Sequence, residues 1–78
     1  MNKQIPGGED VIREYEPVGK YRVRLVRLEG GKRGVDIREF IQSREFQGFT
    51  RRGIRLDARE FSELAARLKR CQSDMDMA

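Results

Sequence analysis

The segment around Gly30-Gly31 constrains the fold of this chain most, because it sets two glycines between two runs of alternating apolar and polar residues. The run before the glycines, YRVRLVRL, covers residues 21–28, and the run after them covers residues 33–41. Alternation with a period of two is typical of a half-buried strand, and paired glycines allow the positive φ angles of a tight turn. The segment therefore predicts a hairpin of two long antiparallel strands.

Both strands carry an irregularity in their pattern. In the first strand the alternation predicts that Arg22 and Arg24 face solvent, but it slips phase at Leu25-Val26, which predicts a bend or bulge with Val26 turned inward. In the return strand the phase changes again near Phe40. Two long strands with matching irregularities predict a curved sheet.

Weaker patterns predict the other strands. Residues 49–56 alternate and predict a further strand, whereas the polar residues 42–48 before it predict a loop. Residues 11–15 predict an earlier strand. The chain would then contain four strands, joined in sequence order.

The strongest local pattern predicts a helix after these strands. Asp57 and Glu60 have the spacing of a capping box, and an apolar stripe recurs at helical spacing from Phe61 to about Cys71. We expect residues 1–10 and 73–78 to be flexible ends. The predicted domain therefore covers residues 11–72.

Positive charge is concentrated in the middle of the chain. Residues 20–59 carry twelve basic side chains and five acidic ones, although the formal charge of all 78 residues is only +4. Thirteen of the seventeen basic residues are arginine, whose planar guanidinium pairs with phosphate and stacks on bases. This bias points to an anionic polymer as the partner; arginine enrichment through genome composition is the alternative.

The rarest residue types exclude several functions. Cys71 is the single cysteine and the chain has no histidine, so an internal disulfide, a thiolate zinc site and histidine-assisted catalysis are excluded. We expect neither an enzyme nor a bound metal or cofactor. The chain also lacks a secretory signal and an apolar run long enough to cross a bilayer, which predicts a soluble intracellular protein without a membrane partner.

Several of these features occur together, and in order, in one known family. The chain has VGK at residues 18–20, GVDIREF at residues 34–40, RRGIRL at residues 51–56 and an amphipathic helix after them. Over about residues 11–71 this order resembles the single-stranded-DNA-binding domain of the transcriptional coactivator positive cofactor four. The resemblance implies four antiparallel strands and one helix per subunit, dimers that pair through helix and sheet, and DNA held along curved sheets.

The predicted fold class is therefore α+β, with a four-stranded curved antiparallel sheet followed by one C-terminal helix, as a homodimer. Chain length supports the dimer, because a small open sheet and one apolar helix have too little core to cover each other. We expect Phe61, Leu64 and Leu68 at the dimer interface. Phe40 and Phe61 are expected in the core.

The resemblance also suggests binding residues. It implies that Lys20, Lys32, Arg38 and one or both of Arg51 and Arg52 lie near the DNA backbone. Arg38 has a second interpretation as a surface residue paired with neighbouring acids. The two adjacent arginines favour binding more, since no acid lies near them in the sequence.

Other candidates come from the residues themselves. Arg22, Arg24 and Arg27 either line the binding groove or keep the strand soluble. Phe46, in a polar segment, either stacks on bases or folds back onto the core. The chain departs from the family at Glu29 and Ile41, where the family carries aromatic residues, so that two stacking platforms are missing.

These expectations combine into a functional hypothesis. The chain is expected to bind single-stranded or unpaired DNA with little sequence preference, as a regulator of the transcriptional coactivator type. RNA and melted duplex are further candidate ligands, and transcription-machinery proteins are candidate partners. The alternative is a protein-interaction module of a transcription or replication complex that binds nucleic acid weakly. The location would be the cytoplasm or nucleoid of a bacterium, or the nucleus of a eukaryote.

Overall fold

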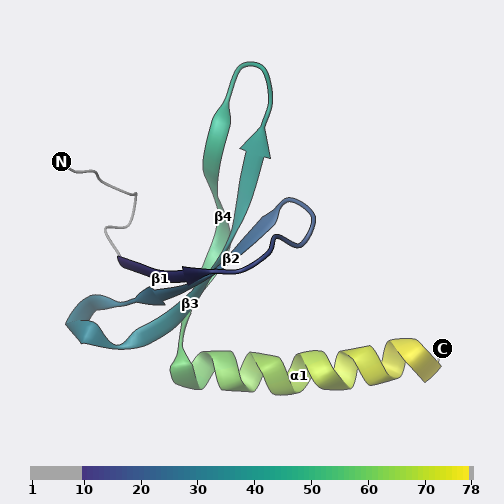
Figure 1. Ribbon diagram of the computed structural model, residues 1–78. Coiled ribbons are helices and arrows are strands. Elements are labelled where there is room, and N and C mark those ends of the chain that lie inside the picture. Colours follow the sequence, from purple (N-terminus) through teal and green to yellow (C-terminus); the bar gives the residue numbers. More distant parts are fainter. Residues whose placement is uncertain (1–9, 78) are drawn as a thin grey trace.

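The computed structural model describes residues 10–77, which form a four-stranded antiparallel sheet followed by one helix (Figure 1). The elements are β1 (Asp10–Glu14), β2 (Tyr21–Arg27), the short 3-10 turn η1 (Glu29–Gly31), β3 (Arg33–Gln42), β4 (Gln47–Asp57) and α1 (Ala58–Met77). The strand order is β1-β2-β3-β4, so that β1 and β4 are the outer strands. The predicted α+β architecture is confirmed. The flexible start predicted for residues 1–10 falls, except for Asp10, outside the described residues.

The register of the strands gives the sheet two chemically different faces. One row across the sheet pairs Arg24 with Asp36 and Asp36 with Arg55, and side chains on this side form what we call the arginine face. The neighbouring row pairs Val23 with Ile37 and Ile37 with Ile54 on the opposite side. We call this apolar side the helix face, because α1 begins next to it.

The irregularity predicted at Leu25-Val26 lies in the neighbouring strand, because β1 pairs Val11 with Val26 and Arg13 with Leu25 and leaves Ile12 as the extra residue. Pairing between β2 and β3 runs without a shift from Tyr21 and Glu39 to Arg27 and Arg33. Val26 therefore shares the arginine face, where it is fully buried, and Arg24 is buried as well instead of facing solvent. The phase slip in the sequence thus marks an apolar residue buried on the polar face, not an extra residue in the strand.

The turn between β2 and β3 uses both glycines as predicted. Gly30 and Gly31 have φ angles of 85° and 86°, in the left-handed region that favours glycine. The loop is longer than a two-residue turn, since the Leu28 amide donates to the Lys32 carbonyl at 2.6 Å around η1. The length of this loop sets the register of the two strands, so that Arg24 lies opposite Asp36.

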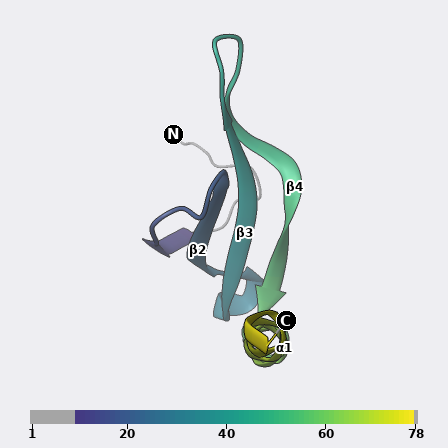
Figure 2. The ribbon, with the colours of Figure 1, turned by 90° about the vertical axis from the view of Figure 1, so that its right-hand side faces the viewer.

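The hairpin of β3 and β4 extends beyond the rest of the sheet as an arm formed by residues 41–48 (Figures 1 and 2). The loop predicted at residues 42–48 is shorter in the structure: Gln42 pairs with Gln47, which leaves residues 43–46 as the turn. Ser43 closes this turn through a backbone bond and a side-chain bond with Phe46. The predicted irregularity near Phe40 is present as a bulge between β3 and β4, opposite Glu39.

The predicted capping box is present at the start of α1. The Glu60 amide donates to Asp57 Oδ1 at 2.8 Å, and the Asp57 amide donates to Glu60 Oε1 at 3.0 Å. The helix continues to Met77, so that residues 73–77 of the predicted flexible end are helical. The apolar stripe weakens near Cys71, but no glycine or proline follows to end the helix.

A single chain leaves the helix face largely uncovered. The molecule is only 18 Å thick along its shortest axis, and its radius of gyration is 14.6 Å, against about 11.5 Å for a compact domain of this length. Figure 2 shows α1 end-on at one end of the sheet, and Figure 1 shows its second half extending past the strands. Phe61 and Leu68 are exposed and Leu64 is half-buried, so Phe61 does not form the predicted core of a single chain.

Candidate functional site

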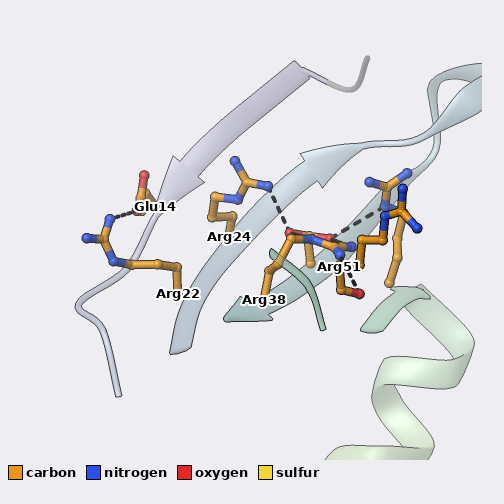
Figure 3. Close-up of polar contacts among 7 residues, drawn as sticks. Glu14, Arg22, Arg24, Arg38 and Arg51 are labelled. Carbon is orange, nitrogen blue, oxygen red and sulfur yellow. Dashed lines mark hydrogen bonds and ion pairs between the residues drawn. The ribbon is translucent and has the colours of Figure 1, made fainter. Parts of the chain in front are cut away.

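Three arginines of the arginine face converge on one buried carboxylate. Arg24 Nη2 lies 2.8 Å from Asp36 Oδ2, Arg38 Nη2 lies 2.9 Å from Asp36 Oδ1, and Arg55 Nε lies 3.6 Å from the same oxygen. The three arginines come from three neighbouring strands, and Figure 3 shows Arg24 and Arg38 reaching toward the same point. We call these four residues the Asp36 cluster.

Electrostatics keep Asp36 ionised although the residue is 0% exposed. Burial disfavours the charged carboxylate, but hydrogen bonds from Arg38 and Arg24 outweigh burial and hold the pKa of Asp36 below its ordinary value. One negative charge therefore faces three positive charges. The guanidiniums that share this carboxylate grow more exposed from Arg24 to Arg38 and Arg55.

Gly53 makes room for the position of Arg38. Arg38 and Gly53 are cross-strand partners, and a Cβ on Gly53 would lie 2.8 Å from the Arg38 Cα and 2.4 Å from the Ile37 carbonyl oxygen. The Arg38 side chain extends over β4, where Nη1 donates to the Arg51 carbonyl at 3.4 Å. The guanidinium is thus fixed by β3 and β4 together.

Two phenylalanines lie beside the cluster on the arginine face. Phe40 and Phe49 meet edge to face, with 5.1 Å between ring centroids. The Arg22 guanidinium lies 4.0 Å from the Phe40 centroid and the Arg24 guanidinium 4.5 Å from that of Phe49. Phe40 is therefore half-buried among arginines and not in the apolar core that the sequence predicted.

A second ion-pair group lies at the bulge. The buried Glu39 carboxylate accepts from Lys20 Nζ and from Thr50 Oγ1, each at 2.8 Å. The Lys20 hydrogen bond, and then that of Thr50, lowers the pKa of Glu39, while the same contact with Glu39 raises the pKa of Lys20. Arg52 is close enough to influence both charges. Here cation and anion balance more closely than in the Asp36 cluster.

The structure brings together only part of the predicted binding set. Arg22, Arg24 and Arg38 share the arginine face, and the Arg51 carbonyl contacts Arg38. The remaining predicted residues lie elsewhere: Lys20 and Arg52 next to Glu39, Arg27 and Lys32 beside the β2–β3 turn, and Phe46 in the arm.

The three arginines of β2, for which the sequence left open a place in the groove or a solubilising role, do not share one face. By alternation along β2, Arg27 lies on the side opposite Arg22 and Arg24. Lys32 is likewise at the other end of β3 from the arm. The two alternatives for Arg38 are both present, because this arginine pairs with Asp36 and still belongs to the positively charged face.

Phe46 does not fold back onto the sheet. It is 50% exposed at the end of the arm, and its ring lies close to Gly48 in the same turn. Ile41, one of the two departures from the family, is also exposed on this arm, and Glu29 lies in the β2–β3 turn at the opposite end of β3. The arm thus presents one aromatic ring near its turn.

Four residues of the site were outside the predicted binding set: Asp36, Arg55, Phe40 and Phe49. For binding, Phe40 and Phe49 were considered only as rings that could replace the missing stacking platforms, and Asp36 holds the arginines in place. A signal was available: centring the hairpin on Gly30 places Arg24 opposite Asp36, and an acid opposite a strand arginine indicates a cross-strand pair.

The described residues limit the chemistry of this surface. Residues 10–77 contain no group of three acidic, cysteine or histidine side chains that could hold a metal ion. Within the same residues, no helix is long and apolar enough to span a membrane. The arginine face instead offers fixed guanidiniums and aromatic rings, which suit an anionic ligand with planar groups. No protein-family model, curated protein or solved structure significantly matches this chain.

Proposed function

We propose that this chain binds single-stranded or unpaired nucleic acid through the arginine face, with little sequence preference. The observation that carries this proposal is the Asp36 cluster, in which one buried carboxylate holds three arginines in place on one face of the sheet. Guanidiniums held in place lose less side-chain entropy when they bind phosphate oxygens, which supports a backbone-binding surface.

The neighbouring rings favour a single strand over a duplex. Phe40 and Phe49 lie among the arginines, so a flexible strand can place phosphates and unstacked bases on the same surface. A duplex keeps its bases stacked inside and must bend or melt to do so. Together with the resemblance to positive cofactor four, this supports a role as a regulator of the coactivator type.

We also propose that the functional unit is a homodimer that covers the helix face. A hollow of about 340 Å³ opens between the sheet and the start of α1, lined mainly by apolar side chains that include Tyr15, Val23 and Phe61. With Leu68 exposed further along the helix, a second copy would bury this surface. In sedimentation, Leu64→Asp should yield monomer or unfolded chain, whereas a folded monomer of the unmodified protein would contradict the dimer.

Fluorescence anisotropy with a labelled oligonucleotide tests the binding proposal. The logarithm of affinity should fall with the logarithm of salt concentration, by about 0.7 per phosphate contact for a single strand. Replacing Arg38 and Arg55 by Gln should weaken binding to all sequences and reduce the slope by about 1.4. The matched control replaces Arg27 and Lys32, which removes the same charge away from the arginine face and should leave the slope nearly unchanged.

The alternative function is a protein-interaction module. Equal effects of the two double variants would show that overall charge, and not the arginine face, determines binding. No measurable affinity of the unmodified protein for single strand or duplex would favour the interaction module instead.

A further inference from the structure

A pocket lies beside the proposed backbone-binding surface, where the turn between β1 and β2 meets β3. It has a volume of about 430 Å³, within the ordinary range for small-ligand pockets, and is lined by Pro17, Gly19, Lys20, Arg22, Phe40 and Gln42. Glu39 and Arg52, which adjoin Lys20, do not line it. The pocket combines an aromatic ring, a guanidinium, an amide and an ammonium group.

The frame of this pocket is held by main-chain contacts. Val18 and Tyr21 exchange two backbone hydrogen bonds of 2.9 Å around the turn, and Gly19 supplies the φ of 61° that the turn requires. The Phe40 amide donates to the Lys20 carbonyl at 2.8 Å, which ties the turn to β3. The wall residues therefore keep their relative positions without a ligand.

The side chains in the pocket are arranged for a planar ligand. The Arg22 guanidinium lies over the Phe40 ring and is held from the side by Glu14, whose Oε2 lies 3.2 Å from Nη1 (Figure 3). Arg22 remains partly exposed, and guanidinium planes stack on nucleobases. Gln42 supplies a donor and an acceptor that can pair with the edge of a base.

We infer that this pocket receives one unstacked nucleobase of the bound strand, with the exposed Lys20 ammonium next to the adjoining phosphate. The inference rests on the proposed function and deepens it, because it separates a base-binding pocket from the phosphate-binding Asp36 cluster. A phosphate alone would leave the ring of Phe40 and the amide of Gln42 without a role.

Two oligonucleotides of equal length measure the contribution of bases. One carries thymine at every position and the other has the same backbone with abasic sites, so both present the same phosphates. The unmodified protein should bind the thymine strand about tenfold more tightly, in line with stacking of a single base. Arg22→Lys keeps the charge but removes the planar group, and Gln42→Ala removes the amide; each should reduce this ratio severalfold.

Matched controls come from neighbouring positions. Gln47 is the cross-strand partner of Gln42 and does not line the pocket, and Arg27 is exposed on the other side of β2. Gln47→Ala and Arg27→Lys should leave the ratio unchanged. Thermal melts of all four variants confirm that the fold is retained before affinities are compared.

Photo-crosslinking places the base directly. Oligonucleotides with 5-iodouracil form adducts with nearby aromatic side chains, and trypsin cleavage after Arg38 and Arg44 releases residues 39–44 with Phe40 as the only aromatic. Residues 45–51 carry Phe46 and Phe49 instead. An adduct on the Phe40 peptide supports the pocket, and adducts only on the other peptide overturn it.

The two proposals fail in different ways. If neither oligonucleotide binds, the proposed function is wrong and the pocket inference falls with it. If both bind equally, or if the pocket variants and their controls change the ratio alike, nucleic-acid binding stands and the base pocket is wrong.

Discussion

Asp36→Asn tests whether the buried carboxylate is what holds the arginines of three strands together. Asparagine keeps the size of the side chain but removes the negative charge that faces Arg24, Arg38 and Arg55. Arg24 is only 4% exposed, so its guanidinium would stay buried after losing the Asp36 carboxylate. Breaking a buried ion pair from one side costs about 3–5 kcal/mol.

This loss is large for so small a chain. A stability of about 0.05–0.15 kcal/mol per residue gives roughly 4–12 kcal/mol for 78 residues, so the variant should be marginally folded or unfolded. Urea denaturation followed by circular dichroism, at one fixed protein concentration, measures the change in the free energy of unfolding. The control is Glu14→Gln, which breaks the exposed pair with Arg22 and should cost less than about 1 kcal/mol.

A double variant separates the stranded charge from other effects. Arg24→Gln in the Asp36→Asn background also removes the buried guanidinium that faced this carboxylate. The free energy of unfolding lost by the double variant should therefore be much smaller than the sum of the losses of the two single variants. If Asp36→Asn costs no more than Glu14→Gln, or if the two substitutions are additive, the carboxylate does not organise the cluster.

Three further predictions concern stability. The lowered pKa of Asp36 adds stability that is present above the unfolded value of 3.8 and is lost as pH falls through the lower folded value. Asp36→Asn should therefore make the free energy of unfolding depend less on pH in the acid range, and an unchanged dependence would contradict this. Gly53→Ala places a Cβ against the backbone of β3 and should destabilise the sheet far more than Gly30→Asn, whose site is open; thermal melts giving similar losses would contradict the close approach. Asp57→Ala removes the cap of α1 and should cost about 0.5–2 kcal/mol in urea denaturation, with no loss expected if the capping box does not contribute.

Local patterns in the sequence predicted most of the fold. The glycine pair, the alternation of residues 33–41 and the capping box at Asp57 each depend on near neighbours, and each is present in the structure. The exact ends of elements were harder to predict. The arm is a strand pair although its residues are polar, because the ladder between Gln42 and Gln47 needs no apolar face.

The site was harder to predict because it depends on pairing between strands. Arg24 alternates with apolar residues and therefore resembled a solvent-facing side chain, but Asp36 and Phe49 cover it from strands further along the chain. Val26 is buried, as the sequence predicted, but it lies on the arginine face because β2 keeps its register with β3. Predicting these contacts requires the register between paired strands. One extra residue in the connecting loop can shift that register by one residue and turn the side chains to the other face.

The outer strand β4 has a consequence for how copies of this chain behave in solution. Its exposed arginines, Arg51, Arg52 and Arg55, repel a second β4 that approaches edge to edge, and the bulge opposite Glu39 interrupts the straight edge that such stacking needs. A polyanion that neutralises these charges removes the repulsion. Solutions of the protein with a nucleic acid should therefore become turbid near charge equivalence and clear again when either component is in excess, with added salt dissolving the condensate.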